Sequence, residues 1–248
     1  MNSGAAVPAL YGQLERLAGS THGDLRLRIP PGYAFARPVS QAPLVVDEIG
    51  ESAKHFPVVF PEGETVRPIA LLGVRLGECA FVDADGGWQA DYMPAWLRRY
   101  PFTFARGAAA DDARLDVMID RAAPHFSTTD GEPLFQAGEP GSQALKPSAV
   151  IERAVAFLSR YQRAADAVPD FFAPLAAHDV LVARALRVRV PSARDRRIGG
   201  LCVVDRDRVK ALDDVTLAAW TRSGLMEVIH AHWQSLTNFE RLANASHH

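Results

Sequence analysis

Residues 68–102, PIALLGVRLGECAFVDADGGWQADYMPAWLRRYPF, decide the fold because strands, a turn and a helix follow one another within this stretch. Two apolar runs, 69–74 and 80–82, predict short strands. Residues 85–87, Asp-Gly-Gly, predict a tight turn, since glycine accepts positive φ angles without steric cost. Residues 93–100 predict a short helix. It ends at the next proline because proline has no amide hydrogen to continue it.

The same patterns continue on both sides of this stretch. Further apolar runs of strand length occupy residues 44–46, 57–60, 102–104, 115–119, 181–190 and 198–204. Helical spacing or caps predict a turn over 48–56 and helices after Ser148, after Asp213 or Asp214, and over 225–243. These elements interleave without regular alternation. We therefore expect an α+β fold: a mixed, largely antiparallel sheet of short strands, packed by helices concentrated in the C-terminal third.

The domain organisation follows from composition along the chain. Residues 1–40 are rich in small residues, Gly and Pro, and predict an N-terminal arm around one helix at 10–17. Residues 41–243 predict a single α+β domain. The Pro- and Gly-rich loop 122–147 is a possible internal boundary, although Leu134 and Phe135 indicate that it is anchored. Residues 244–248 are expected to form a disordered tail.

Composition limits the classes of function. The chain has 248 residues, 48% of them hydrophobic, and a formal net charge of −2. That charge favours no polyanion, so we expect no nucleic-acid partner. No basic leader with an apolar run is recognisable, and no apolar run reaches the roughly 18 residues of a membrane helix, so a soluble, cytoplasmic protein is expected. Two cysteines, Cys79 and Cys202, exclude a disulfide framework.

An aromatic and arginine-rich block is the main candidate site. It consists of Trp88, Tyr92, Trp96, Arg98, Arg99 and Tyr100. Arginine beside Trp or Tyr favours stacking and recognition of carboxylates, and this composition is common in binding hot spots. A structural alternative has the rings packing the helix on the sheet while the two arginines pair with Asp91 or Asp120. Both interpretations stay open at this point.

Acidic and histidine residues provide secondary candidates. Asp83 and Asp85 lie as in the start of a calcium loop, but no third Asp or Asn and no closing Glu follow, so an acidic turn is favoured and no metal is expected. His230 and His232 point in different directions on a helix and cannot chelate a metal together. His232 falls on an apolar stripe that predicts a core histidine, whereas His230 is expected to be solvated.

No motif in the sequence specifies a reaction. Nucleotide-binding glycine loops, the GxSxG nucleophile elbow and HExxH are all missing, and no cofactor is expected. One enzymatic alternative remains, in which His232 acts with carboxylate neighbours, possibly with a metal. The leading hypothesis is a non-catalytic accessory or binding protein. Its partner would be a peptide, a protein or a small acidic ligand, and its oligomeric state is open.

The block and its surroundings also resemble a known family. The run 92–102, YMPAWLRRYPF, the runs 70–73 and 81–83 with Gly86 and Trp88, and the pattern SLTN at 235–238 are similar to the SapC family of bacterial proteins. The resemblance covers residues 35–242. It implies a bacterial protein associated with surface layers, or with peptide transport as an accessory, and it brings no catalytic residues that can be assigned position by position.

Overall fold

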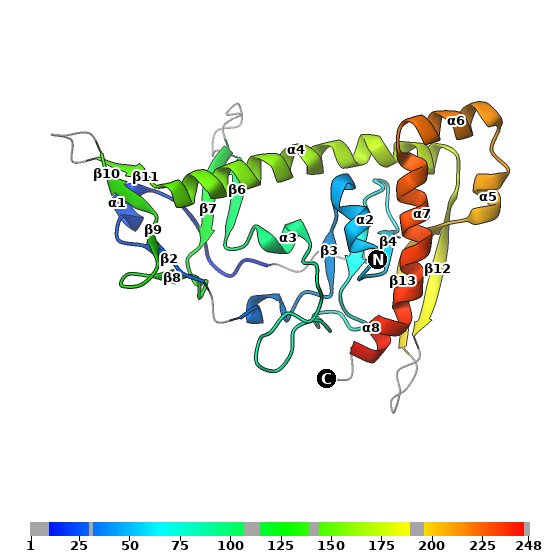
Figure 1. The fold of residues 1–248 in the computed structure, drawn as a ribbon. Coiled ribbons are helices and arrows are strands. Elements are labelled where there is room, and N and C mark those ends of the chain that lie inside the picture. The colour runs from blue at the N-terminus through cyan, green and yellow to red at the C-terminus, as the bar shows by residue number, and fades with distance from the viewer. Residues whose placement is uncertain (1–9, 30–31, 107–114, 139–143, 189–195, 246–248) are drawn as a thin grey trace.

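The computed structural model describes residues 10–29, 32–106, 115–138, 144–188 and 196–245 and combines helices with antiparallel sheets (Figure 1). The α+β prediction is confirmed. One hydrophobic cluster of buried side chains extends from Leu10 to Leu242 and so joins both ends of the described chain. Among the described helices, none is long and apolar enough to cross a membrane.

The largest sheet has five strands in the order β12-β13-β4-β5-β3, with every neighbouring pair antiparallel. Its strands are β3 (Gln41–Pro43), β4 (Val58–Pro61), β5 (Ile69–Leu71), β12 (Leu181–Val188) and β13 (Arg196–Val204). The strands β4 and β5 are apolar, and all their residues except Pro61 are buried, as expected for strands covered on both faces. The predicted strand at 44–46 lies just after this pairing region, because the ladder uses residues 41–43 instead.

Three smaller sheets lie at the other end of the molecule (Figure 1). Their orders are β1-β7-β6, β8-β2-β9 and β10-β11. The strands are β1 (Leu14–Arg16), β2 (Arg26–Leu27), β6 (Phe102–Arg106), β7 (Leu115–Asp120), β8 (Phe126–Ser127), β9 (Glu132–Pro133), β10 (Phe135–Ala137) and β11 (Leu145–Pro147). The predicted helix at 10–17 is therefore wrong: Leu14–Arg16 pairs with β7.

Short helical segments connect these strands. They are α1 (Gly19–His22), η1 (Ala34–Ala36), η2 (Val46–Glu48), α2 (Ile49–Ser52) and α3 (Ala95–Arg98). The predicted tight turn is confirmed, since Gly86 has φ 87° and Val82 bridges to Trp88 across it. Within the described residues, the run 80–82 joins no sheet beyond that isolated bridge. Its other backbone hydrogen bonds lie outside the sheets; for example, the Ala80 amide donates to the Leu72 carbonyl.

One long helix, α4 (Ala149–Ala177), runs along most of the molecule and spans both groups of sheets (Figure 1). It begins where the sequence predicts, because the Ser148 hydroxyl accepts a hydrogen bond from the Val150 amide. Its buried side chains, among them Ile151, Leu158 and Phe172, recur on one face. The loop before it carries β8 to β11 and buries Leu134 and Phe135, which confirms the expected anchor.

The C-terminal helices pack on the five-stranded sheet. They are α5 (Arg206–Lys210), α6 (Asp214–Arg222), α7 (Leu225–Ser235), η3 (Leu236–Asn238) and α8 (Phe239–Ala245). Asp213 caps α6, and Gly224 at φ 82° ends the turn before α7, as predicted. The single helix expected over 225–243 is interrupted by η3. Helix α8 extends into the expected tail, whose residues 246–248 lie outside the description.

Segments expected to be peripheral are also part of this architecture. The described part of the N-terminal arm contributes two strands, and it buries Leu25, Ala36 and Val39 completely or nearly so. Because this arm is anchored in the core, it is positioned to form one wall of the candidate site. The loop expected at 107–114 lies outside the described residues.

Candidate functional site

The aromatic and arginine-rich block is fixed to the fold by a buried carboxylate. Glu48, only 6% exposed, accepts hydrogen bonds from the Tyr92 hydroxyl (2.7 Å), the Ala95 amide (2.7 Å) and the Val45 amide (3.0 Å). Three donors satisfy the charge of a buried carboxylate. Burial, and then the hydrogen bond to Glu48, raise the pKa of Tyr92 well above its usual range. The sequence reasoning missed Glu48, whose signal is an acidic residue inside the apolar run 44–49.

A second buried carboxylate holds the other end of the block. Asp120 accepts hydrogen bonds from the Tyr100 hydroxyl (3.0 Å) and from the amides of Gly12 (2.8 Å) and Gln13 (2.9 Å). Burial alone would raise the pKa of Asp120, but the hydrogen bonds from the amides of Gly12, Gln13 and Ala122 and from the Tyr100 hydroxyl together keep that pKa below its ordinary value. Tyr100 also stacks on Phe35 at a centroid distance of 4.4 Å. The ring of Tyr100 is therefore held in one orientation.

The two arginines of the block do not form the predicted ion pairs. Within the described residues, neither Arg98 nor Arg99 pairs with a carboxylate, so the expectation of Asp91 or Asp120 as partner is wrong. Asp120 is already occupied by backbone amides. Arg98 instead donates from Nε to the Met93 carbonyl (3.0 Å) and is exposed.

Aromatic rings surround both guanidinium groups. Arg98 lies 5.6 Å from the ring centroid of Tyr92 and 5.5 Å from that of Phe157 on α4. Arg99 lies within 5.6 Å of three ring centroids, those of Tyr11, Trp96 and Tyr161, and its buried Nε has no hydrogen-bond partner in the part of the chain that the structure describes. Cation–π contacts of this kind hold a cation without neutralising it. The positive charge of the block is thus retained.

The predicted residues divide between core and surface. Trp96 is buried at 6% exposure and packs inside, whereas Arg98 is exposed and Trp88, Tyr92 and Arg99 are half-buried. The Trp88 indole donates to the Tyr92 carbonyl (2.9 Å), which fixes its ring at the surface. The structure thus supports the structural alternative for Trp96 and for Tyr100, which is 9% exposed, and leaves Trp88 and Tyr92 partly accessible.

Two adjoining hollows lie beside the block. The first, of about 700 Å³, is walled by aromatic rings: Tyr33, Phe35, Trp88, Tyr92 and Tyr100. The second, of about 380 Å³, lies between the block, β6 and the first turns of α4. Both are lined by Ile29, Arg98, Tyr100 and His125. We call the two hollows together the groove. Their volumes lie in the range of small-molecule sites.

The second hollow is strongly positive. Of the residues that the structure describes, Arg28, Arg98, Arg99 and Arg153 line it, against one acidic residue, Glu132. Glu132 is paired with Arg153 at 2.8 Å, and both of these side chains are more than half exposed. Arg28 donates from Nε to the Pro124 carbonyl (3.0 Å) and, like Arg98, has no carboxylate partner among the described residues. Among the described residues, the groove therefore holds three arginines, Arg28, Arg98 and Arg99, without a carboxylate partner.

A histidine lies where the two hollows meet. His125 is 7% exposed, its Nδ1 has no hydrogen-bond partner among the described residues, and its ring packs edge-on against Phe35 and Tyr100. Burial, and then the charge of Arg28, lower its pKa to about 4. His125 is thus neutral at pH 7. Sequence reasoning missed it, because a single histidine in a Pro-rich loop carries no recognisable pattern.

The acidic pair forms a turn. Asp83 accepts from the amides of Asp85 (3.0 Å) and Gly87 (2.7 Å), so one of its carboxylate oxygens closes the turn between Val82 and Trp88. Asp85 is exposed. Within the described parts of the chain, no three His, Cys, Asp or Glu side chains lie close enough together to hold a metal ion. The turn that Asp83 closes places Gly87 and Trp88 in the wall of the first hollow.

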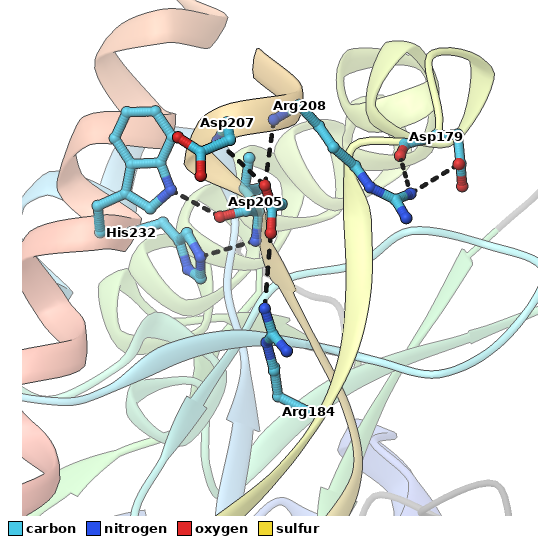
Figure 2. A network of polar contacts seen from close by, with 8 residues as sticks. Asp179, Arg184, Asp205, Asp207, Arg208 and His232 are labelled. Atoms are coloured by element: carbon cyan, nitrogen blue, oxygen red, sulfur yellow. Dashed lines mark hydrogen bonds and ion pairs between the residues drawn. The ribbon is translucent and has the colours of Figure 1, made fainter. Parts of the chain in front are cut away.

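His232 lies in the core, as predicted. It is 0% exposed, its Nε2 accepts from the Val204 amide (3.1 Å) and its Nδ1 donates to the Val58 carbonyl (2.7 Å). Figure 2 shows it beside the ion pairs and backbone bonds of Asp205 and Arg208. Burial lowers its pKa to about 4. With both ring nitrogens used, His232 has none free for a substrate, and the enzymatic alternative gains no support from it. His230 is exposed, as predicted.

Comparison with known proteins identifies the family. No match to the chain was found among curated proteins or among solved structures. The family model described as SapC matches residues 17–242, a range that contains both hollows, the two buried carboxylates and His232. The match covers nearly the whole chain. This protein therefore belongs to the SapC family.

Proposed function

We propose that this SapC-family protein is a non-catalytic binding protein whose groove holds an acidic ligand, which can be a small molecule or an acidic group of a peptide or protein. The proposal rests on one observation: Arg28, Arg98 and Arg99 line the second hollow without a carboxylate partner among the described residues. The cytoplasmic location and the surface-layer or transport association stay predictions.

The arginines are oriented before any ligand arrives. The Nε of Arg28 and the Nε of Arg98 each donate a hydrogen bond to a backbone carbonyl, at 3.0 Å in both cases. This bond fixes the plane of each guanidinium group. The two terminal nitrogens of each group form the edge that binds a carboxylate in a bidentate manner, and on Arg98 one of them also lies 3.4 Å from the Tyr92 hydroxyl. Orientation in advance lowers the entropy lost on binding. The arrangement therefore favours a planar anion over a neutral ligand.

The aromatic walls of the first hollow supply the contact area. Trp88, Tyr92 and Tyr100 are each held by a hydrogen bond, to the Tyr92 carbonyl, to Glu48 and to Asp120 respectively. Rings fixed in this way contribute apolar area at little entropic cost, as in binding hot spots. An acidic ligand with a flat or apolar part would thus contact both the rings and Arg98.

A calorimetric titration tests the proposal. The probes are hexanoate, succinate and an Asp/Glu-rich peptide, each added to the wild-type protein, to Arg98→Gln and to the control Arg222→Gln. Arg222 is an exposed arginine on α6, outside both hollows. A hydrogen bond to a charged group contributes about 1.5–3 kcal/mol, so Arg98→Gln should weaken binding of the anion by roughly 10- to 100-fold. Salt should weaken it further, because the arginine is exposed.

Two results would contradict the proposal. The first is that none of the three anions binds the wild-type protein. The second is that Arg98→Gln and Arg222→Gln bind equally well, since a general attraction to positive surface charge would then account for all of the affinity. Succinimide, which has no charge, serves as the neutral control for succinate.

A further inference from the structure

We infer that the second hollow receives the apolar body of a monocarboxylate whose carboxylate lies against Arg28 and Arg98. This inference rests on the proposed function and names its ligand class. The hollow measures about 380 Å³, which is large enough for a small organic acid and near the lower limit of ligand sites.

The walls of the second hollow are mainly apolar. Phe102, Val150 and Leu158 line it and are at most 5% exposed, so they belong to the core and form its closed side. Ala154 and Phe157 line it as half-buried residues. A ligand whose carboxylate lies against Arg28 and Arg98 extends its other atoms along these walls, and a second charge placed beside Phe102, Val150 and Leu158 would be costly. The walls therefore favour a ligand with one charged end.

The geometry of α4 explains how apolar and charged groups meet here. Residues 150, 153, 154, 157 and 158 follow the three- and four-residue spacing of one helix face, and all five line the hollow. Arg153 lies on this face, and its pairing with exposed Glu132 places it at the mouth. The helix thus presents an apolar stripe with a cation at the rim.

The position of Arg98 links the charged end to the apolar wall. Its guanidinium lies 5.5 Å from the ring centroid of Phe157, so a carboxylate bound to Arg98 would have its adjoining carbons beside that ring. Arg28 lines the same hollow from the end of β2. Three elements distant in sequence, β2, α3 and α4, thus provide an anion site and an apolar pocket that adjoin.

A chain-length series tests this inference. Acetate, butyrate, hexanoate and octanoate are titrated by calorimetry into the wild-type protein, Ala154→Leu and the control Ala156→Leu. Ala154 lines the hollow, whereas Ala156 is exposed on the same helix and does not, and leucine suits a helix at both positions. N-acetyl-leucine is included as a mimic of the last residue of a peptide.

Affinity for the wild-type protein should rise about fourfold per added methylene until the hollow is filled. Ala154→Leu should remove most of this rise while binding acetate as the wild type does, and Ala156→Leu should leave it unchanged. Tighter binding of N-acetyl-leucine than of hexanoate would assign the carboxylate to a peptide terminus, and the reverse would assign it to a free acid.

The outcomes separate this inference from the proposed function. If affinity is independent of chain length while Arg98→Gln still weakens binding, the acidic-ligand function stands and the apolar pocket is refuted. The same follows if Ala154→Leu and Ala156→Leu give the same chain-length dependence. If no carboxylate binds at all, both are refuted.

Discussion

Replacing His232 by leucine tests the core of the C-terminal half. The imidazole joins two elements of the sheet, since it accepts from the Val204 amide on β13 and donates to the Val58 carbonyl on β4. Leucine fills a similar volume but leaves both backbone groups buried without this partner. Each such group costs about 1–3 kcal/mol, so His232→Leu should lower the free energy of unfolding by about 2–5 kcal/mol at pH 7.5.

The pH dependence gives a second measure of the same contact. The pKa of His232 is lowered to about 4 in the fold by burial, against 6.5 for a free histidine, so the unfolded chain takes up a proton first. Wild-type stability should therefore fall as the pH drops from about 6.5 towards 4, by roughly 1.4 kcal/mol per pH unit from this residue. The leucine variant lacks this contribution. The difference in free energy of unfolding between the wild type and His232→Leu should thus be about 2 kcal/mol smaller at pH 5 than at pH 7.5.

Urea unfolding at pH 7.5 and pH 5, followed by circular dichroism, measures both effects. His230→Leu is the matched control, because it changes an exposed histidine two residues away and should shift stability by less than about 0.5 kcal/mol. His125 also titrates at low pH, but it is present in all three proteins and its contribution cancels in the comparison. Equal stabilities for His232→Leu and His230→Leu, or a gap that does not change with pH, would refute the reasoning.

Two further substitutions test the supports of the groove by urea unfolding. Glu48→Gln should lower the free energy of unfolding by about 1.5–3 kcal/mol, because a neutral amide cannot accept all three hydrogen bonds. The control Glu51→Gln, at an exposed position, should lower it by less than about 0.5 kcal/mol. Similar losses in the two variants would show that Glu48 does not hold the block. Gly224→Ala should lower the free energy of unfolding by about 1–2 kcal/mol, because alanine is strained at a φ of 82°. The control Gly50→Ala in α2 should be neutral or stabilising. No loss of stability in Gly224→Ala would mean that the backbone of this turn adapts.

Local patterns predicted the elements that depend on local chemistry. The Ser148 and Asp213 caps, the turn at Gly86 and the break at Gly224 all follow from backbone demands that one or two residues meet. The helix expected at 10–17 is wrong for the opposite reason. Its helical periodicity is overridden by pairing with β7 and by Asp120, which accepts from two amides just before β1.

The candidate site was only partly visible in the sequence. Trp88, Tyr92 and Arg98 are close together in the chain, so composition was enough to select them. Arg28 and His125 line the same groove from distant segments, as does the face of α4, and only the tertiary fold brings them together. Trp96 has the same composition signal but packs inside, because side-chain direction on a one-turn helix depends on what covers it.

The most direct test of the account is a crystal structure of the protein grown with octanoate. We expect the carboxylate within hydrogen-bonding distance, about 3 Å, of the guanidinium groups of Arg28 and Arg98, with the chain lying along Phe157 in the second hollow. Octanoate bound elsewhere on the protein, with both arginines free of it, would contradict the claim that this groove is an acidic-ligand site.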